Sequence, residues 1–453
     1  MAQPLGGVTV LVAGAGLAGL AAARDLVALG ASVTVIDARE RIGGRVWTVR
    51  DGFTGGQHAE AGGDLIDEAQ HEIRNLCAEL GLKLTRILRR GFAYVGTDRS
   101  RKARVVVRDA SRGWERIGAR LRKLGRPYQL AEQRWDSPIA EDLARRSVSQ
   151  WLDEVGADDE LRTTVRGLRG FFLADPEELS LLALVDQFAG EGPSLPWKTY
   201  RVDGGNDRLA AALAAPLGER LRLNTELVAV SHRGNVVRVT VKRGRAAASI
   251  SSEYLVLALP ATTLRRVPIT PALPAQQHDA IARLKYGRAT KTLLQFSQRF
   301  WRGPHGPQAF GSSLPFGAIW DGNEQQRGRT GILSSLAGGG ASDAAQTILS
   351  REGPQGFVNA LNWLGSERAT LIASRQIVWE NDPLARGGYA FFDPAFDPQL
   401  RAWLARPCGR LFFAGEHTSL KWQGYMNGAI ESGRRAAAEV AAAHRNQSEP
   451  GRR

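Results

Sequence analysis

The sequence is poor in cysteine. Only Cys77 and Cys408 occur among its 453 residues, and they stand far apart, without the spacing of a metal site. This count excludes a disulfide framework and gives no reason to expect a zinc centre. Because thiols stay reduced in the cytosol, we predict a cytoplasmic protein that holds no metal.

Long apolar runs are also scarce. The segment VTVLVAGAGLAGLAAA, residues 8–23, carries no charge, but it contains three glycines, and the MAQPLGG before it has no basic side chain. A membrane helix needs about 20 apolar residues, and a signal peptide begins with a positively charged region. We therefore interpret this segment as buried structure of a soluble protein and expect no membrane span.

Acidic residues are in deficit, and the deficit is local. The formal net charge is +14, and residues 86–126 hold 14 Lys or Arg against three acids, which contributes +11 of it. No stacking pattern or nucleic-acid motif accompanies this charge. We interpret the segment as a solvated, arginine-rich face and expect no nucleic-acid partner. Docking to an anion or a membrane surface is the alternative.

What the sequence does contain is clearest near the N-terminus. Residues 8–16 have the pattern of a continuous β run, residues 17–30 carry apolar residues at helical spacing and close on Gly30, and residues 32–38 have the pattern of a second buried strand. This order predicts a βαβ unit.

The turn after the first strand carries Gly14-x-Gly16-x-x-Gly19, and Asp37 ends the second strand. In this context Gly14 permits the tight turn, Gly16 lets the backbone approach a pyrophosphate, and Gly19 lets the helix pack on the strand. The helix N-terminus offers N–H groups to phosphate, and Asp37 would accept hydrogen bonds from a ribose diol. The sequence therefore predicts a dinucleotide site.

The segment after this acid points to the kind of dinucleotide. IDARERIGGR, residues 36–45, resembles the segment that follows the dinucleotide fold in the flavin-containing amine oxidases. That family includes monoamine oxidases, bacterial ones among them, polyamine oxidases and L-amino-acid oxidases. Residues 60–82, 200–213 and 412–437 are similar to further flavin-contacting segments of the family. The family usually has Glu where this chain has Asp37, a shorter side chain that should still span to a ribose. The resemblance implies FAD as the cofactor.

The length also bears on the fold, because 453 residues exceed the roughly 250 to 300 that one hydrophobic core serves. The resemblance implies an α/β protein with the two-domain architecture of amine oxidases, in which a Rossmann-like FAD-binding domain is joined to a discontinuous α+β substrate domain. We expect the FAD-binding domain from residues 5–82, 200–266 and 375–443, the substrate domain from residues 83–199 and 267–374, and a disordered tail over residues 444–453.

The same resemblance implies which residues contact FAD. They lie in the glycine motif, at the end of the second strand, in two later glycine pairs and in the C-terminal stretch. They are Gly14, Gly16, Leu17, Ala18, Gly19, Asp37, Ala38, Arg39, Gly43, Gly44, Arg45, Gly62, Gly63, Asp64, Leu227, Gly415, Glu416, Gly424, Tyr425 and Met426. Within the C-terminal stretch, Gly424 and Tyr425 should begin the closing helix, and His417 should be a structural hydrogen-bonding group, not a base.

Catalysis should need orientation and exclusion of water more than a dedicated base, because the flavin itself accepts the hydride. Tyr425 matches a tyrosine that the family places beside the flavin, and Trp379 matches an aromatic near the same ring. Lys291 matches a lysine that the family holds near flavin N5 through a water, and its charge suits the reduction of oxygen. With Asp67, discussed below, these are the expected catalytic residues.

One departure from the family concerns FAD attachment. Monoamine oxidases bind FAD covalently through a cysteine after a glycine pair, and the corresponding run here, RGGYAFF, has Tyr389 at that place. FAD should therefore be non-covalent. The next position, where those enzymes carry a second tyrosine of the aromatic cage, is Ala390, so the site should be wider or closed by Phe391 or Phe392.

A second departure concerns the substrate. L-amino-acid oxidases hold the substrate carboxylate with an arginine soon after the second glycine pair, where this chain has Asp64 and Asp67. An acid there would repel a carboxylate and attract an ammonium group, and Asp67 matches an acid at the tunnel of polyamine oxidases. This favours a primary or polyamine-type amine. Arg-rich lids could still supply a carboxylate clamp, and Asp67 could be a solvated loop residue.

The leading hypothesis is an FAD-dependent oxidase that converts an amine to an imine, which hydrolyses to a carbonyl product, while O2 is reduced to H2O2. Its partners would be a small amine and O2, and the oligomeric state stays open, with a homodimer among the allowed assemblies. The alternatives are an L-amino-acid oxidase, a flavin dehydrogenase or desaturase of the same fold that uses another electron acceptor, and a non-catalytic basic interaction protein that uses residues 86–126.

Overall fold

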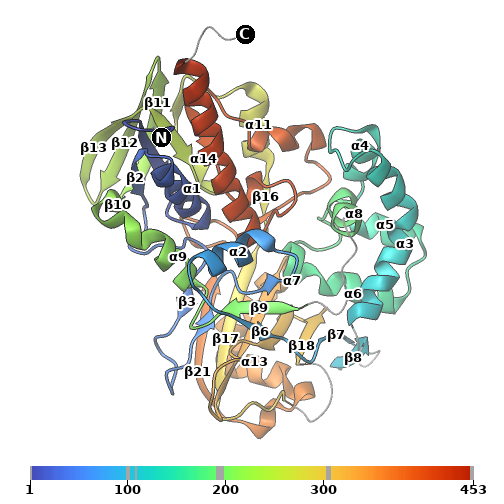
Figure 1. Ribbon diagram of the computed structural model, residues 1–453. Coiled ribbons are helices and arrows are strands. Elements are labelled where there is room, and N and C mark those ends of the chain that lie inside the picture. The colour runs from blue at the N-terminus through green and yellow to red at the C-terminus, as the bar shows by residue number, and fades with distance from the viewer. Residues whose placement is uncertain (1–2, 98–102, 108–109, 190–197, 303–307, 449–453) are drawn as a thin grey trace.

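Two large sheets organise the chain in the computed structural model, which describes residues 3–97, 103–107, 110–189, 198–302 and 308–448 (Figure 1). One sheet is parallel and lies with the N-terminal and C-terminal helices, and the other has seven strands and lies at the opposite end of the molecule. A group of helices from the middle of the chain flanks the second sheet.

The parallel sheet contains the predicted βαβ unit. Its strand order is β10 (Leu221–Arg222), β2 (Ser32–Ile36), β1 (Thr9–Ala13), β14 (Tyr254–Leu257) and β23 (Leu411–Phe413). Both faces of β1 are buried: Val10 and Val12 pack on one side, and Leu11 and Ala13 pack on the other. A strand alternates its side chains between the two faces, so a strand covered on both sides is a continuous apolar run, as predicted.

Helices from both ends and from the middle of the chain cover one face of this sheet. They are α1 (Leu17–Ala28), α2 (His71–Glu79), α9 (Asp207–Ala214) with η1 (Ala215–Arg220), and α14 (Met426–Ser448). Figure 1 shows the C-terminal α14, in red, beside the N-terminal α1, in blue. Their approach depends on Gly433, where a Cβ atom would lie 2.2 Å from the carbonyl oxygen of Ala18.

A smaller antiparallel sheet and short helices cover the other face. The sheet order is β13 (Ala246–Ser252), β12 (Val236–Arg243), β11 (Glu226–Arg233) and β15 (Ile269–Thr270), with α10 (Ala261–Leu264), α11 (Ala275–Arg283) and η4 (Pro398–Leu404) nearby. Val230, Val237 and Val239 face Leu11 and Ala13 of β1 in this core.

The seven-stranded sheet has the order β21 (Leu371–Val378), β17 (Ala289–Phe296), β20 (Gly331–Gly338), β19 (Ala318–Asp321), β18 (Ala309–Ser312), β7 (Phe92–Thr97) and β8 (Ala103–Val107). One face packs against α12 (Gly340–Glu352), α13 (Pro354–Ala360), η2 (Asn362–Leu364) and η3 (Ser366–Arg368). Leu294 and Ile319 point into that core, whereas Lys291 and Trp320 lie on the opposite face, toward a large cavity.

The remaining elements join these parts. The flanking helices are α3 (Ala110–Leu130), α4 (Pro138–Ala144), α5 (Val148–Glu154), α6 (Asp159–Gly167), α7 (Arg169–Phe172) and α8 (Leu181–Ala189). Small sheets are formed by β5 (Ile66–Asp67), β9 (Thr199–Val202) and β6 (Leu84–Ile87), by β3 (Thr48–Val49) and β4 (Ala59–Glu60), and by β16 (Lys285–Tyr286) and β22 (Ala390–Phe391).

The basic segment contains α3, which buries Trp114, Ile117, Leu121 and Tyr128 and exposes its arginines except the half-buried Arg116. Within the segment, residues 98–102 and 108–109 lie outside the described ranges. Among the helices of those ranges, none combines the length and the apolar character that a bilayer crossing requires.

The structure differs from the sequence-based expectations at two boundaries. The predicted domain boundary at residue 375 falls inside β21, which belongs as a whole to the seven-stranded sheet. The expected disordered tail is wrong for residues 444–448, which continue α14, because Gln447 accepts hydrogen bonds from Arg410 and Tyr254. Residues 449–453 lie outside the described ranges.

Candidate active site

One cavity of about 1800 Å³ runs between the parallel sheet and the seven-stranded sheet. It begins at the glycine turn after β1, passes the glycine pairs near residues 43 and 62, and reaches Lys291, Trp320 and Tyr425. Every predicted site residue lines this cavity except Gly19. Sequence segments that are far apart in the chain therefore meet at one site.

Gly19 has a packing role. A Cβ atom there would lie 1.8 Å from the carbonyl oxygen of Gly14, so only glycine lets α1 start this close to β1. Gly14 has φ +111° and lies against Ala258, where a Cβ atom would be 2.6 Å from the carbonyl oxygen. The motif thus places the N-terminus of α1, with Gly16 and Leu17, at the wall of the cavity.

Asp37 stands at the end of β2, as predicted for a ribose acceptor. Its carboxylate already accepts the backbone N–H of Ala15 at 2.7 Å and that of Arg39 at 2.8 Å. Burial raises the pKa of Asp37, while these two hydrogen bonds oppose that shift. These two hydrogen bonds hold the shorter acid rigidly at the cavity wall. Each oxygen keeps a lone pair that can accept from a further donor.

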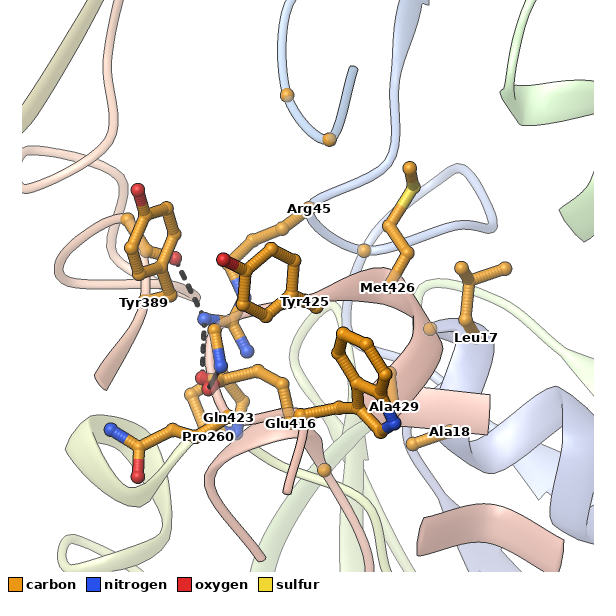
Figure 2. Close-up of a pocket in the computed structure, with 18 of the residues that line it drawn as sticks. Leu17, Ala18, Arg45, Pro260, Tyr389, Glu416, Gln423, Tyr425, Met426 and Ala429 are labelled. Carbon is orange, nitrogen blue, oxygen red and sulfur yellow. Dashed lines mark hydrogen bonds and ion pairs between the residues drawn. The ribbon is translucent and has the colours of Figure 1, made fainter. Parts of the chain in front are cut away.

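Arg39 and Arg45 are both paired with acids across the cavity. Arg39 forms two hydrogen bonds with Asp382, at 2.8 and 2.9 Å. Arg45 donates to Glu416 at 2.9 Å and to the Gly388 carbonyl at 2.7 Å. The second oxygen of Glu416 accepts the backbone N–H of Gly424 at 2.9 Å, so the Arg45–Glu416 ion pair fixes the C-terminal stretch against the N-terminal one (Figure 2).

The C-terminal stretch differs in one detail from the expectation. Gly424 has φ +82° and precedes the closing helix, which begins at Met426 and not at Gly424. This turn directs Tyr425 into the cavity, and burial raises the pKa of its phenol, with the Asp67 charge adding to the shift.

His417 is buried, and burial lowers the pKa of its imidazole to about 4. It does not line the cavity. A neutral, enclosed imidazole suits the structural role that was expected for it.

The aromatic walls are formed by Tyr425, Tyr389, Trp379 and Trp320. Figure 2 shows the rings of Tyr389 and Tyr425 next to each other, and the Tyr389 hydroxyl donates to the carbonyls of α7 at Gly170 and Phe171. Trp379 donates its indole N–H to Ala61 at 3.0 Å.

The expectation that Phe391 or Phe392 closes the site is wrong. Neither side chain lines the cavity, because Phe391 packs into the helical core and Phe392 packs against Trp135. Tyr389 itself stands at the wall instead.

A second correction concerns Asp64, which is not an uncompensated acid. One of its oxygens accepts the Lys291 ammonium at 2.9 Å and the Trp320 indole N–H at 2.9 Å, and the other accepts the Arg201 guanidinium. Burial alone would raise the pKa of Asp64, but Arg201 and Lys291 together hold it below its ordinary value. Asp64 therefore has no charge to spare for a substrate ammonium group.

Asp67 is different. It lies on β5, half-buried in the cavity wall, and its side-chain hydrogen bonds are with Thr199 at 3.2 Å and Gln70 at 3.4 Å. Within the described ranges no cation pairs with it. Burial raises the pKa of Asp67 to about 6.

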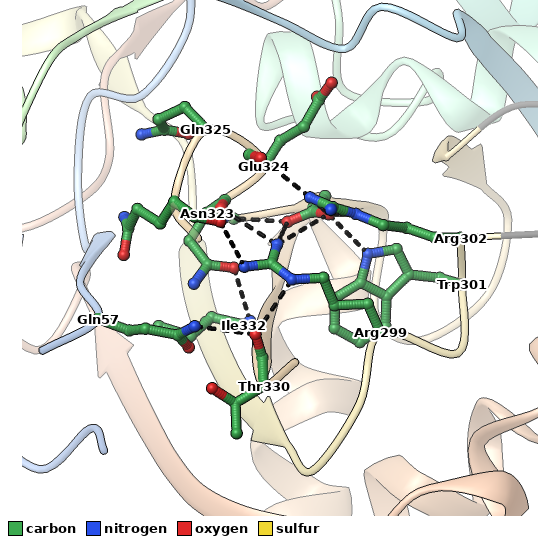
Figure 3. A network of polar contacts seen from close by, with 12 residues as sticks. Gln57, Arg299, Trp301, Arg302, Asn323, Glu324, Gln325, Thr330 and Ile332 are labelled. Carbon is green, nitrogen blue, oxygen red and sulfur yellow. Dashed lines mark hydrogen bonds and ion pairs between the residues drawn. The ribbon is translucent and has the colours of Figure 1, made fainter. Parts of the chain in front are cut away.

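Sequence reasoning missed Arg201 and Trp320. Arg201 lies on β9 and also donates to the Gly322 carbonyl at 2.9 Å and to Gln325 at 3.0 Å, which ties it to the β19–β20 turn. Asp321, the last residue of β19, fixes the start of that turn because it accepts hydrogen bonds from Arg299, Trp301 and Arg302. Figure 3 shows these three side chains in one network of polar contacts with Asn323. No local motif marks either residue, because their partners come from distant segments.

The residues present fit FAD. The volume exceeds the roughly 300–1,000 Å³ of an ordinary small-molecule pocket and is elongated from a phosphate-binding turn to an aromatic end. At Gly16 a Cβ atom would meet nothing within 4 Å, so open space adjoins the helix N-terminus where a pyrophosphate would lie. Neither Cys77 nor Cys408 lines the cavity, so no thiol is available for a covalent bond.

Comparison with known proteins agrees with this geometry. The family model described as flavin containing amine oxidoreductase matches residues 17–441. AofH of Mycobacterium tuberculosis, provisionally named a flavin-containing monoamine oxidase, is 30% identical over 96% of this chain and 97% of its own. Amine oxidase [flavin-containing] A of Sus scrofa is 24% identical, over 96% of this chain and 85% of its own.

Solved structures are similar over nearly the whole chain. Cyclohexylamine oxidase from Brevibacterium oxydans is 26% identical with a TM-score of 0.83, covering 96% of this chain and 99% of the other. A putrescine oxidase has the same fold, with a TM-score of 0.82 and 24% identity over 96% and 99% of the two chains. The chain therefore belongs to the flavin-containing amine oxidoreductase family, as an amine oxidoreductase that binds FAD without a covalent bond.

Proposed function

We propose that the protein is an oxidase for amines that carry no carboxylate at the reacting carbon, and that O2 is its electron acceptor. The amine loses a hydride and a proton to give an imine, and water hydrolyses the imine to a carbonyl compound and ammonia or a smaller amine. O2 takes up the two electrons and two protons to form H2O2. FAD supplies the electron acceptor between the two half-reactions.

The observation that carries the substrate class is the charge balance at the aromatic end of the cavity. The cations Arg45 and Lys291 are each paired with a buried carboxylate, Glu416 and Asp64, respectively. Asp67 is the acid in this wall that has no cationic partner within the described ranges. A substrate carboxylate would meet this acid while Arg45 and Lys291 are already paired, whereas an ammonium group would pair with it.

The chain's own residues have three tasks in this reaction. Tyr425 and Tyr389, with Trp320 and Trp379, confine the amine and exclude water, which strengthens the electrostatic interactions inside. Asp67 orients a substrate by its cationic end. Lys291 provides a positive charge where negative charge develops as O2 is reduced.

A peroxide assay over a panel tests this function. The panel contains aliphatic and aromatic monoamines, α,ω-diamines and L-amino acids, with the purified holoenzyme in air-saturated buffer. We expect turnover of amines with stoichiometric H2O2. Turnover of L-amino acids alone would contradict the substrate class, and slow reoxidation in air would instead support a dehydrogenase or desaturase.

A further inference from the structure

Lys291 is an unusual residue for the middle of a sheet. It lies on β17, between β20 and β21, and its side chain is 2% exposed. Its ammonium lies 4.2 Å from the centroid of the Trp320 ring, which attracts the charge, and 2.9 Å from Asp64. Two groups therefore hold this ammonium in one place.

The surroundings are otherwise unfavourable for a cation. Burial lowers the pKa of Lys291, and the Arg201 guanidinium, on the other side of Asp64, lowers it further. Removal from water disfavours the charged form of a buried lysine. Where no partner compensates, this lowers the pKa of the lysine by several units. One carboxylate thus serves two buried cations.

Asp64 is itself held in a defined orientation. Arg201 and Trp320 donate to it, and Arg201 is anchored on the β19–β20 turn through Gly322 and Gln325. The Trp320 indole binds the same oxygen that accepts from Lys291, so the indole restricts where the ammonium can stand. The arrangement links the lysine to a rigid turn and not to a mobile loop.

We propose that Asp64 is a positioning residue for the oxygen half-reaction, which keeps Lys291 charged and fixed at the cavity wall. Arg201 limits how much of the negative charge of Asp64 is available to the lysine. This inference rests on the proposed role of Lys291 in the reduction of O2, and its test separates the two.

The first measurement follows the ionisation of Lys291 directly. The sequence has only eight lysines, so a holoenzyme labelled with [ε-13C]lysine should give few signals, and Lys291→Met identifies the one that belongs to Lys291. We expect Asp64→Asn to lower the pH midpoint of this signal by at least about one unit. Arg201→Gln should shift the midpoint in the opposite direction, and it keeps the test available if Asp64→Asn does not fold.

The matched control is Asp393→Asn. It also removes a buried carboxylate that pairs with a lysine, Lys285, but Asp393 does not line the cavity. We expect it to move the Lys285 signal while leaving the Lys291 midpoint unchanged. A shift of the Lys291 midpoint of equal size in Asp64→Asn and Asp393→Asn would show that loss of stability, and not the ion pair, moves the signal.

The second measurement is stopped-flow reoxidation of the reduced holoenzyme. At a pH above the new midpoint, Asp64→Asn should react with O2 about tenfold more slowly or worse, and its rate should recover as the pH is lowered through that midpoint. An unchanged midpoint together with an unchanged rate would overturn the inference. If Lys291→Met is reoxidised at the wild-type rate, the role of Lys291 in the oxygen reaction fails, and with it the role proposed for Asp64 in that half-reaction.

Discussion

At the scale of single residues, we propose that Asp67 decides which amines fit. Replacement by Asn removes its charge and keeps its size and its contact with Thr199. We expect Asp67→Asn to raise KM for diamines about tenfold or more relative to monoamines, because a charge-assisted contact contributes roughly 1.5–3 kcal/mol. Since burial raises the pKa of Asp67 to about 6, KM for diamines in the wild type should fall as the pH rises through that value.

Steady-state kinetics with a diamine and a monoamine of equal chain length check this prediction. The control is Glu68→Gln, one position along the chain, because Glu68 is paired with Lys198 at 2.8 Å. Equal effects of the two substitutions on the diamine would contradict a specific role for Asp67.

A second residue links pH to stability. Glu60 is buried, accepts from Thr48 at 2.8 Å and from the Asn206 N–H at 2.9 Å, and has its pKa raised to about 8 by burial and then by the Asp64 charge. The folded state therefore holds a proton that the unfolded state has released above its ordinary pKa of 4.5. The contribution of Glu60 to the free energy of unfolding is fully present below pH 4.5 and is lost as the pH rises toward 8.

We expect the wild type to lose roughly 2–4 kcal/mol of unfolding free energy from this site between pH 5 and 8. Glu60→Gln, which keeps the shape of the protonated acid, should remove that loss. Denaturant unfolding at several pH values measures it, with Glu68→Gln as a partly exposed control. Parallel pH profiles for the wild type and Glu60→Gln would show that Glu60 does not carry the effect.

At the scale of elements, the contact between α1 and α14 is set by a glycine. A Cβ atom on Gly433 would lie 2.2 Å from the Ala18 carbonyl oxygen, and Ala18 lines the cofactor cavity. We expect Gly433→Ala to cost about 1–3 kcal/mol through overpacking, which exceeds the roughly 1 kcal/mol gained in helix propensity. It should also weaken FAD retention.

The chain offers a matched control for this substitution. Gly125 lies in α3, and a Cβ atom there would meet nothing within 4 Å. Gly125→Ala should therefore stabilise the protein by up to about 1 kcal/mol. Calorimetry and flavin fluorescence distinguish the two, and destabilisation of equal size at both positions would contradict the steric explanation.

Elements with a strong local signal could be predicted from the sequence. The β1–α1–β2 unit follows from its apolar pattern and its glycines, and Asp37 follows from its place after β2. The extension of α14 to Ser448 could not be predicted, because the polar residues there give no helical signal and Gln447 is held by Arg410 and Tyr254. The end of this helix is therefore set by tertiary contacts and not by the local sequence pattern.

The same limit applies to the candidate site. The acidic character of Asp64 was visible in the sequence, but its neutralisation was not, because Arg201 lies 137 positions away and Lys291 lies 227 positions away. The closure by Phe391 or Phe392 failed for a related reason. The turn around Gly388 and Tyr389 determines which of the adjacent aromatic residues faces the cavity. The Tyr389 hydroxyl is held there by backbone carbonyls of α7.

At the scale of the whole molecule, one cavity joins both large sheets, so the cofactor should stabilise the entire chain. We expect acid precipitation of the yellow protein to release all of its FAD into the supernatant. The protein without flavin should have a lower Tm, and FAD at 100 times its Kd should restore about 2.7 kcal/mol. Riboflavin, which lacks the pyrophosphate and adenosine, should restore less. Flavin that stays with the precipitate would contradict a non-covalent site.

The preference of this chain for arginine over lysine has a chemical consequence. A carbonyl product formed by amine oxidation condenses with neutral primary amines, and arginine offers none. Of the eight lysines, Lys291 is the one whose side chain is buried within the described ranges, and it stands in the wall of the product's own cavity. Paired with Asp64 as an ammonium ion, it has no lone pair for that condensation, so we expect a carbonyl product formed in this cavity to leave Lys291 unmodified.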